Sequence, residues 1–323
     1  MSESTRTLRV AAVQMASENG QIDANLARAL PLVEQAAAQG AQLIVLPEFM
    51  PTGYLMTPAI WDGGEPADGP TVRWLKQHAA RLGVYLGTSF LEAEGEDFHN
   101  TFVLATPQGE IAGRVRKQTP AAFETFFTKG DAGPHTIDTP LGRIGVGICY
   151  ENQLTFLPRL MAAQSVDLML MPHSAPLATQ GVIFPKKAIQ ADRAALKSLT
   201  PFYARMLGIP VMLVNKHGPW ETPLPLLGPL AYQRSRFPGL SAITDSDGTL
   251  KAQLDDQEGV IVEDVTLDPA RKTNSATRRR GRWNRNETWS KKIFVLAEAT
   301  GRIWYRFKRE RKQKARAISA GQA

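Results

Sequence analysis

Two segments of the sequence repeat the order strand, helix, strand, and this repetition restricts the fold more than any other feature. In the first segment, the apolar runs 8–15 and 41–49 enclose residues 23–40, whose apolar side chains recur at helical spacing. In the second, the runs 142–151 and 166–174 enclose a short helical stretch, LPRLMAAQS. Buried strands joined by helices are typical of parallel pairs inside an α/β domain. The pattern therefore predicts a layered α/β fold.

Three other strands follow one another without an intervening helix. They are predicted at residues 84–95, 99–109 and 110–118, and the turns that join them contain Gly95 and Gly109. Strands joined by tight turns pair antiparallel, whereas strands joined by helices pair parallel. The sheets are therefore predicted to be mixed.

One later segment, residues 219–239, is rich in Pro and Gly and shows no periodicity. We interpret it as a loop. Loops of this length inside a compact domain are usually functional or disordered.

Composition and cysteine content indicate the compartment. A hydrophobic fraction of 43% and a charged fraction of 21% are ordinary for a soluble domain. We find no secretory signal and no run of the ~18 apolar residues that a membrane span needs. Cys149 is the only cysteine, which excludes intrachain disulfides and suits a reducing compartment. The five histidines show no ligand spacing, so we expect a cytoplasmic protein without a metal or other cofactor.

The positive charge of the chain is concentrated near its C-terminus. Residues 278–316 contain 15 Lys and Arg and three acidic residues, whereas the rest of the chain contains 23 basic and 28 acidic residues. The net charge of +7 therefore comes from the tail. We divide the chain into a body, residues 1–268, and a basic C-terminal extension, residues 269–323.

Three interpretations of this extension stay open. Its tryptophans and two short amphipathic stretches, KKIFVLAEA and RIWYRFKRE, would suit an arm that contacts a partner subunit. A basic amphipathic segment can also lie on an anionic membrane surface. The third interpretation is a solvated tail with affinity for nucleic acid. This affinity would be non-specific, because no nucleic-acid motif accompanies the charge.

Cys149 ends the strand-like run GVGIC and could be either a packed core residue or a catalytic nucleophile. A lone cysteine is more often a small packed residue than a nucleophile. However, Glu48 and Lys117 also stand at predicted strand ends, and Glu124 follows Lys117 by seven residues. Polar groups at strand ends of an α/β sheet can converge in one cleft. A thiol, a carboxylate base and a cation in one cleft are the components of nucleophilic catalysis.

The segments LIVLPEF, RKQTPAAFETFFTKGD and GVGICYEN occur in that order and resemble the nitrilase superfamily of carbon–nitrogen hydrolases. The resemblance extends from about residue 8 to about residue 268 and includes the late stretch FPGLSAITDSDG. It implies a four-layer α-β-β-α sandwich with mixed sheets, of the nitrilase-like kind. It also implies assembly as a homodimer or a larger homo-oligomer.

The same resemblance implies a role for each motif residue. Glu48 would be the general base, and Cys149 would attack the substrate carbon to form a thioester or thioimidate. Lys117 would stabilise the charge of the tetrahedral intermediate together with the backbone N–H of Tyr150. Glu124 would orient Lys117 or the substrate, although a purely structural charge is the alternative for this residue.

Further residues near these motifs are candidates for the substrate pocket. His173 stands where members of the superfamily line the pocket, and the run CYEN is closer to the C-W-E-N of nitrilases than to the C-Y-D of many amidases. Phe127 and Trp220 are additional wall candidates, with core packing as the alternative for Phe127. The predicted substrate-binding set is Tyr54, Tyr150, Glu151, Asn152, His173 and Ser174.

The predicted function is hydrolysis of a non-peptide C–N bond in a small-molecule amide, with a nitrile as the second candidate substrate. One alternative is N-acyl transfer, in which an amine replaces water on the same acyl-cysteine. The other is a non-catalytic, nitrilase-like oligomeric scaffold.

Overall fold

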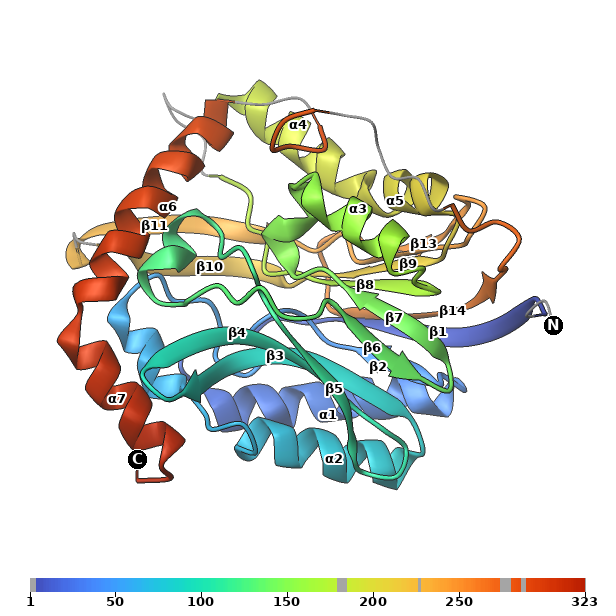
Figure 1. Ribbon diagram of the computed structural model, residues 1–323, viewed down its shortest axis with the longest axis horizontal. Helices are drawn as coiled ribbons and strands as arrows, with labels where there is room; N and C mark the ends of the chain where they lie inside the picture. The colour runs from blue at the N-terminus through green and yellow to red at the C-terminus, as the bar shows by residue number, and fades with distance from the viewer. Residues whose placement is uncertain (1–3, 179–184, 226–227, 274–279, 286–288, 323) are drawn as a thin grey trace.

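The computed structural model describes residues 4–178, 185–225, 228–273, 280–285 and 289–322 (Figure 1). Within these residues two six-stranded sheets face each other, with helices on both outer sides (Figure 1). This arrangement confirms the predicted four-layer α-β-β-α sandwich.

The first sheet is mixed, as expected from the alternation of helices and tight turns. β1 to β3 run parallel, and β4 and β5 then return antiparallel after short turns. Its strand order is β14 (Gly259–Leu267), β1 (Arg6–Gln14), β2 (Leu43–Val45), β3 (Tyr85–Glu94), β4 (Asp97–Ala105) and β5 (Ile111–Arg116).

The second sheet repeats this design around the cysteine. β7, β8 and β9 are parallel, and antiparallel strands flank them on both sides. Its strand order is β13 (Leu250–Gln253), β12 (Ala242–Thr244), β9 (Val211–Val214), β8 (Leu168–Pro172), β7 (Gly142–Val146) and β6 (Thr136–Thr139).

The central strands β2 (LIV), β8 (LMLMP) and β9 (VMLV) are buried along their whole length, which explains why they are apolar. Successive side chains point to opposite faces of a strand, so in β1 Val10 and Ala12 pack between the two sheets. Ala11 and Val13 of the same strand pack instead in the layer of α1 (Ile22–Ala38) and α2 (Pro70–Leu82). The opposite outer layer consists of α3 (Phe156–Ala163), α4 (Lys186–Lys197) and α5 (Leu199–Leu207).

The prediction of a loop over residues 219–239 is wrong. β10 (His217–Leu224) and β11 (Gly228–Pro238) pair there as an antiparallel ribbon. A two-stranded ribbon leaves most of the outer edge of β10 outside the sheet ladder, where a proline without an N–H is tolerated. Pro219 and Pro223 therefore break the sequence pattern without preventing the strand.

The C-terminal extension packs against one end of the layers, at the left of Figure 1. It forms α6 (Trp289–Phe307) and α7 (Arg309–Ser319), so the two short stretches predicted there belong mainly to one long helix. Tyr305 and Ile318 pack in an aromatic cluster with residues of the body. The division of the chain at residue 268 stays a prediction. No helix in the described part of the chain is long and apolar enough to cross a membrane.

The charges of α7 are paired with acidic residues of the body. Arg311 binds Asp97, and Lys314 binds Asp62. Lys312 and Arg316 both bind Glu96, the former at 3.1 Å between Nζ and Oε2. Part of the basic charge of the extension therefore compensates the acidic body of the same chain.

Candidate active site

Lys117 lies between two carboxylates at one end of the sandwich. Its Nζ is 2.7 Å from Glu48 Oε1 and 2.6 Å from Glu124 Oε2, and all three side chains are completely buried. Glu48 follows β2, Lys117 follows β5, and Glu124 lies in the short helix η2 (Ala122–Phe126). The structure thus brings together three of the four predicted catalytic side chains.

Asn100 of β4 completes this cluster and was not predicted. Its Nδ2 donates to Glu48 Oε1 at 2.8 Å and to Glu124 Oε1 at 3.0 Å. Both carboxylates are thereby held at fixed distances from the ammonium group of Lys117. Asn100 stands between His99 and Thr101 in the polar half of β4, so no sequence signal marked this role.

The neighbours of Glu48 keep it ionised. Burial alone would raise the pKa of Glu48, but the charge and hydrogen bond of Lys117, with help from His173 and Asn100, hold it below its usual value. The backbone N–H of Ser174 also donates to Glu48 Oε2 at 2.7 Å, and Ser174 Oγ donates to the Glu48 carbonyl oxygen at 2.6 Å. A base in this state can accept a proton.

Glu124 behaves differently from Glu48. Burial and the negative charge of Glu48 raise the pKa of Glu124 despite the nearby ammonium group. Lys117 itself stays charged, because the two carboxylates raise its pKa more than burial lowers it. The cluster is therefore a buried cation with one firmly ionised carboxylate.

Cys149 begins the short helix η3 (Cys149–Gln153), in a backbone conformation that non-glycine residues rarely adopt. Its φ angle is +51°, and such strained residues are concentrated at functional sites. Burial and the charge of Glu48 raise the pKa of the thiol well above its usual value, while the charge of Lys117 lowers it. Hydrogen-bonding residues connect this turn to Glu48: Asn152 donates to the Cys149 carbonyl oxygen and lies 3.0 Å from His173, whose neighbour Ser174 binds Glu48. The resting thiol is protonated, so it needs a base to become a nucleophile.

Glu151 and Asn152 anchor the turn that carries Cys149. Glu151 Oε2 accepts the backbone N–H of Ile148 at 3.1 Å, and its Oε1 accepts those of Gln118 and Thr119 at 2.8 Å and 3.1 Å. Asn152 Nδ2 donates to the carbonyl oxygens of Gly147 and Cys149. We infer that both residues position the cysteine turn against the loop after Lys117.

His173 is buried directly after β8 and is held neutral. Burial lowers the pKa of His173 to about 4. Its Nε2 lies 3.0 Å from Asn152 Nδ2. Among the described residues, Nδ1 has no hydrogen-bond partner. This buried ring nitrogen is available to hydrogen-bond a bound molecule.

An aromatic wall adjoins the cluster. The ring of Tyr54 lies 6.0 Å from that of Phe49 and 5.7 Å from that of Trp220, measured between centroids. Trp220 Nε1 also donates to the Tyr54 carbonyl oxygen at 2.7 Å. Burial and the negative charge of Glu124 raise the pKa of Tyr54 well above its usual value.

Two other candidates of the sequence analysis point elsewhere. Phe127 is fully buried in the cluster formed with the C-terminal extension, and its carbonyl oxygen accepts a hydrogen bond from Trp61 Nε1 at 3.0 Å. The hydroxyl group of Tyr150 donates to Glu298 Oε1 at 2.7 Å, so its side chain is turned toward α6. Of Tyr150, only the backbone is a candidate for contact with substrate.

Lys216 is a second buried lysine and was not predicted. Its Nζ donates to the carbonyl oxygen of Phe49 at 2.8 Å and lies 5.8 Å from the ring centroid of Phe237. Burial lowers the pKa of Lys216 to about 7, although Glu48 opposes this shift. The side chain therefore loses its proton near neutral pH.

Lys216 makes the stability of the protein dependent on pH. Because its folded-state pKa is about 7 and its unfolded value is near 10.5, the unfolded state binds more protons between these two pH values. We expect the free energy of unfolding of the wild type to rise from pH 7 to pH 9, relative to Lys216→Met, by at most about 1.4 kcal/mol per pH unit. Urea denaturation at several pH values measures this difference. Parallel pH profiles for the two proteins would contradict the assignment.

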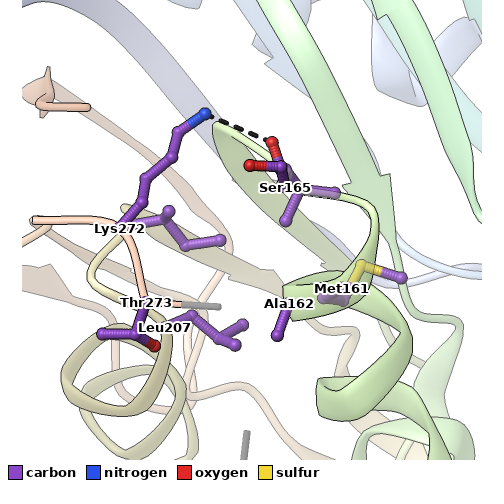
Figure 2. Close-up of a pocket in the computed structure, with 8 residues that line it drawn as sticks. Met161, Ala162, Ser165, Leu207, Lys272 and Thr273 are labelled. Carbon is purple, nitrogen blue, oxygen red and sulfur yellow. Dashed lines mark hydrogen bonds between the residues drawn. The ribbon is translucent and has the colours of Figure 1, made fainter. Parts of the chain in front are cut away.

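A small hollow on the outer side of the second sheet shares no residue with this cluster (Figure 2). Lys272 Nζ donates there to the Ser165 carbonyl oxygen at 3.2 Å. The labelled side chains around it are Met161, Ala162, Ser165, Leu207, Lys272 and Thr273 (Figure 2). We assign this hollow no chemistry.

Within the described residues, no group of three or more His, Cys, Asp or Glu side chains is arranged to hold a metal ion.

Comparison with known proteins agrees with this geometry. The chain is 32% identical over 190 residues to the bifunctional nitrilase/nitrile hydratase NIT4A of Nicotiana tabacum, which covers 52% of this chain and 54% of the tobacco protein. It is 30% identical over 187 residues to a nitrilase of Pyrococcus abyssi, covering 57% of this chain and 71% of that protein. The chain spans about half the length of the tobacco relatives it matches.

Solved structures share the fold. The carbon-nitrogen hydrolase of Helicobacter pylori G27 superposes with a TM-score of 0.72 at 20% identity, covering 94% of this chain and 96% of that one. An amidase from Nesterenkonia sp. superposes with a TM-score of 0.66 at 23% identity, covering 81% and 91%. The sequence profile of one family, carbon-nitrogen hydrolase, matches residues 9–275, which is most of the chain. The protein therefore belongs to the carbon–nitrogen hydrolase family.

Proposed function

We propose that the protein hydrolyses a small amide through an acyl-cysteine intermediate. One observation carries this proposal: a completely buried Glu48–Lys117–Glu124 cluster adjoins a strained, protonated cysteine. Burying three ionisable groups costs several kcal/mol per ion before pairing, so such a cluster is more typical of a functional site than of packing.

The reaction follows from the protonation states. Glu48 accepts the thiol proton as the sulfur of Cys149 bonds to the carbonyl carbon, and the electron pair of the C=O bond moves to oxygen. Lys117 and the backbone N–H of Tyr150 stabilise this oxyanion. The C–N bond then breaks, the leaving nitrogen takes the proton from Glu48, and a thioester remains. Water, deprotonated by Glu48, attacks the thioester; the thiol recovers its proton and the acid is released.

The remaining predicted residues shape the pocket in this proposal. The Nδ1 of His173 has no hydrogen-bond partner among the described residues, so we assign it to the substrate. Tyr54 and Trp220 form the aromatic wall. Ser174 holds Glu48 and bounds the pocket from the end of β8. Glu124 holds the ammonium group of Lys117 toward the oxyanion. Glu151 and Asn152 contribute by placing the nucleophile.

A nitrile is the second candidate substrate. The tobacco and Pyrococcus relatives are named as nitrilases or nitrile hydratases, and this favours a nitrile over other non-amide substrates. Attack of Cys149 on the nitrile carbon would give a thioimidate, and the same base and cation would assist its hydrolysis.

A panel of small amides and nitriles tests the proposal directly. Ammonia release by the wild type, together with an acyl adduct on Cys149 in the mass spectrum, is the expected result. Products separated by liquid chromatography distinguish amide from nitrile hydrolysis, and added amines reveal acyl transfer if N-acyl products form. Neither ammonia nor an adduct with any compound would favour the scaffold alternative.

The outer face of α6 is a candidate contact surface. Leu296, Ile303 and Phe307 are 68%, 62% and 74% exposed and follow one line along the helix, beside the exposed Arg302 and Arg306. Exposed apolar lines of this kind mark interfaces. We propose that this face contacts a second copy of the chain in a homo-oligomer.

Because a catalytic thiol is preserved in a reducing compartment, we place the protein in the cytoplasm.

This surface yields a prediction that separates the interpretations of the extension. The variant Leu296→Ser/Phe307→Ser is expected to elute as a smaller species than the wild type in size-exclusion chromatography, since it loses apolar contact area. Leu230→Ser, an 89% exposed residue of β11, is the control and should elute like the wild type. An unchanged elution volume, combined with loss of sedimentation with anionic vesicles, would instead support membrane contact.

A further inference from the structure

The residue after the nucleophile is bound by the C-terminal extension. Tyr150 Oη donates to Glu298 Oε1 at 2.7 Å across 148 positions of sequence. Glu298 is itself only 3% exposed, and its other oxygen binds Arg282. A buried carboxylate of α6 therefore contacts the side chain whose peptide N–H belongs to the cysteine turn.

Aromatic residues of the same extension enclose Tyr150. Trp283 meets its ring edge to face, with centroids 5.5 Å apart, and Phe294 lies 5.8 Å away. Leu154, just after η3, forms an isolated β-bridge with Trp283. Asn284 Nδ2 donates to the Leu154 carbonyl oxygen at 2.8 Å. The end of the cysteine turn is thus fixed by backbone and side chains of the extension.

The extension also contacts the helix that carries Glu124. α6 packs along η2 so closely that a Cβ atom at Gly301 would lie 2.1 Å from Thr125 Oγ1 and 2.8 Å from the ring of Phe126. Only glycine permits this approach. Residues of the extension between Trp283 and Gly301 therefore touch both short helices of the site, and all of these residues lie beyond the family match, which ends at residue 275.

We propose that Glu298 is a positioning residue for catalysis, acting through the hydroxyl group of Tyr150 to hold the cysteine turn and its backbone N–H in place. This inference rests on the proposed function, because that N–H is the donor assigned to the oxyanion. Burial and the charge of Glu298 raise the pKa of Tyr150, so its hydroxyl group stays protonated and continues to donate. The geometry makes the basic extension part of the catalytic machinery of its own chain.

Two variants break the link from opposite sides. Tyr150→Phe removes the donor, and Glu298→Leu removes the acceptor at similar volume. Each is expected to lower kcat about 10- to 100-fold with little change in KM, because small misplacement of a catalytic group is costly. The double variant should be no slower than the slower single variant, since both changes remove one interaction.

Three controls separate positioning from general damage. Glu298→Gln keeps an oxygen acceptor for Tyr150 and should retain most of kcat. Glu310→Leu changes a 61% exposed carboxylate of the same extension and should behave like the wild type. Hydrogen–deuterium exchange of the peptide covering residues 147–153 needs no substrate. Its protection should fall about tenfold in Glu298→Leu and stay unchanged in Glu310→Leu.

The outcomes are distinct. Wild-type exchange protection at residues 147–153 in both Tyr150→Phe and Glu298→Leu would overturn the inference, whether or not a substrate is known. Wild-type kcat in both variants would overturn it as well. In contrast, absence of turnover in the wild type with every amide and nitrile would contradict the proposed function and not the link itself.

Discussion

Replacing Cys149 with alanine is expected to lower kcat by at least ~10³-fold, the largest effect of any single change considered for activity. In the proposed mechanism the sulfur forms the covalent bond to substrate, and among the described residues no other thiol exists to replace it. Turnover of the substrate found in the ammonia screen measures kcat, and intact-protein mass spectrometry should show that the acyl adduct is lost.

The fold should survive this change, which makes the loss specific. Cys149 packs at the edge of the layer between the sheets, and its side chain is small. We expect a change in unfolding free energy of about 1 kcal/mol, within the usual range for a single substitution. If Cys149→Ala kept wild-type kcat, the covalent route would be wrong, and direct attack of water activated by Glu48 would remain.

Replacing Lys117 with methionine is expected to affect both stability and turnover strongly. The change leaves the carboxylates of Glu48 and Glu124 buried without their cation, and breaking a buried ion pair costs about 3–5 kcal/mol. Turnover should be lost, since the oxyanion loses its charged donor. The stability loss should shrink as the pH falls, because protonation neutralises the unpaired carboxylates. Urea denaturation at pH 5 and pH 8 measures this dependence.

A second substitution separates the two effects. Lys117→Met/Glu124→Gln removes one of the unpaired charges, so part of the stability should return while turnover stays absent. Lys129→Met is a matched control: its ammonium group is 56% exposed and pairs with Asp97, so we expect a change below about 1 kcal/mol. Recovery of turnover in the double variant would show that Lys117 has only a structural role.

The sequence predicted the site best where a residue stands at the end of a strand. Glu48, Lys117 and Cys149 each stand shortly after a strand, and the structure pairs Lys117 with Glu48 where β5 and β2 end. Asn100 and Lys216 were missed because no motif contains them and their polar neighbours in sequence, such as Thr101 and His217, give neither residue a distinguishing pattern. Their partners, the oxygens of Glu48, Glu124 and Phe49, come close only after folding.

The C-terminal extension also combines features that are visible in the sequence with contacts that only the structure reveals. Its basic and amphipathic character is visible in the sequence, and this character suggested contact with a partner or a membrane. The structure adds contacts within the chain: Glu298 binds Tyr150, and Arg311 pairs with Asp97. No local pattern carries such pairings, because each joins residues more than 140 positions apart.

The sequence by itself determined the layered α/β class, the order of the three motifs and the chemical types of the reacting groups. These properties depend on local periodicity and on which side chains follow each strand. Only the tertiary structure decided that β10 and β11 form a ribbon, that Asn100 joins the carboxylates, and that Glu298 adjoins the nucleophile turn. The physical reason is that burial and long-range hydrogen bonds arise from the packing of distant segments. They are absent from any single stretch of chain.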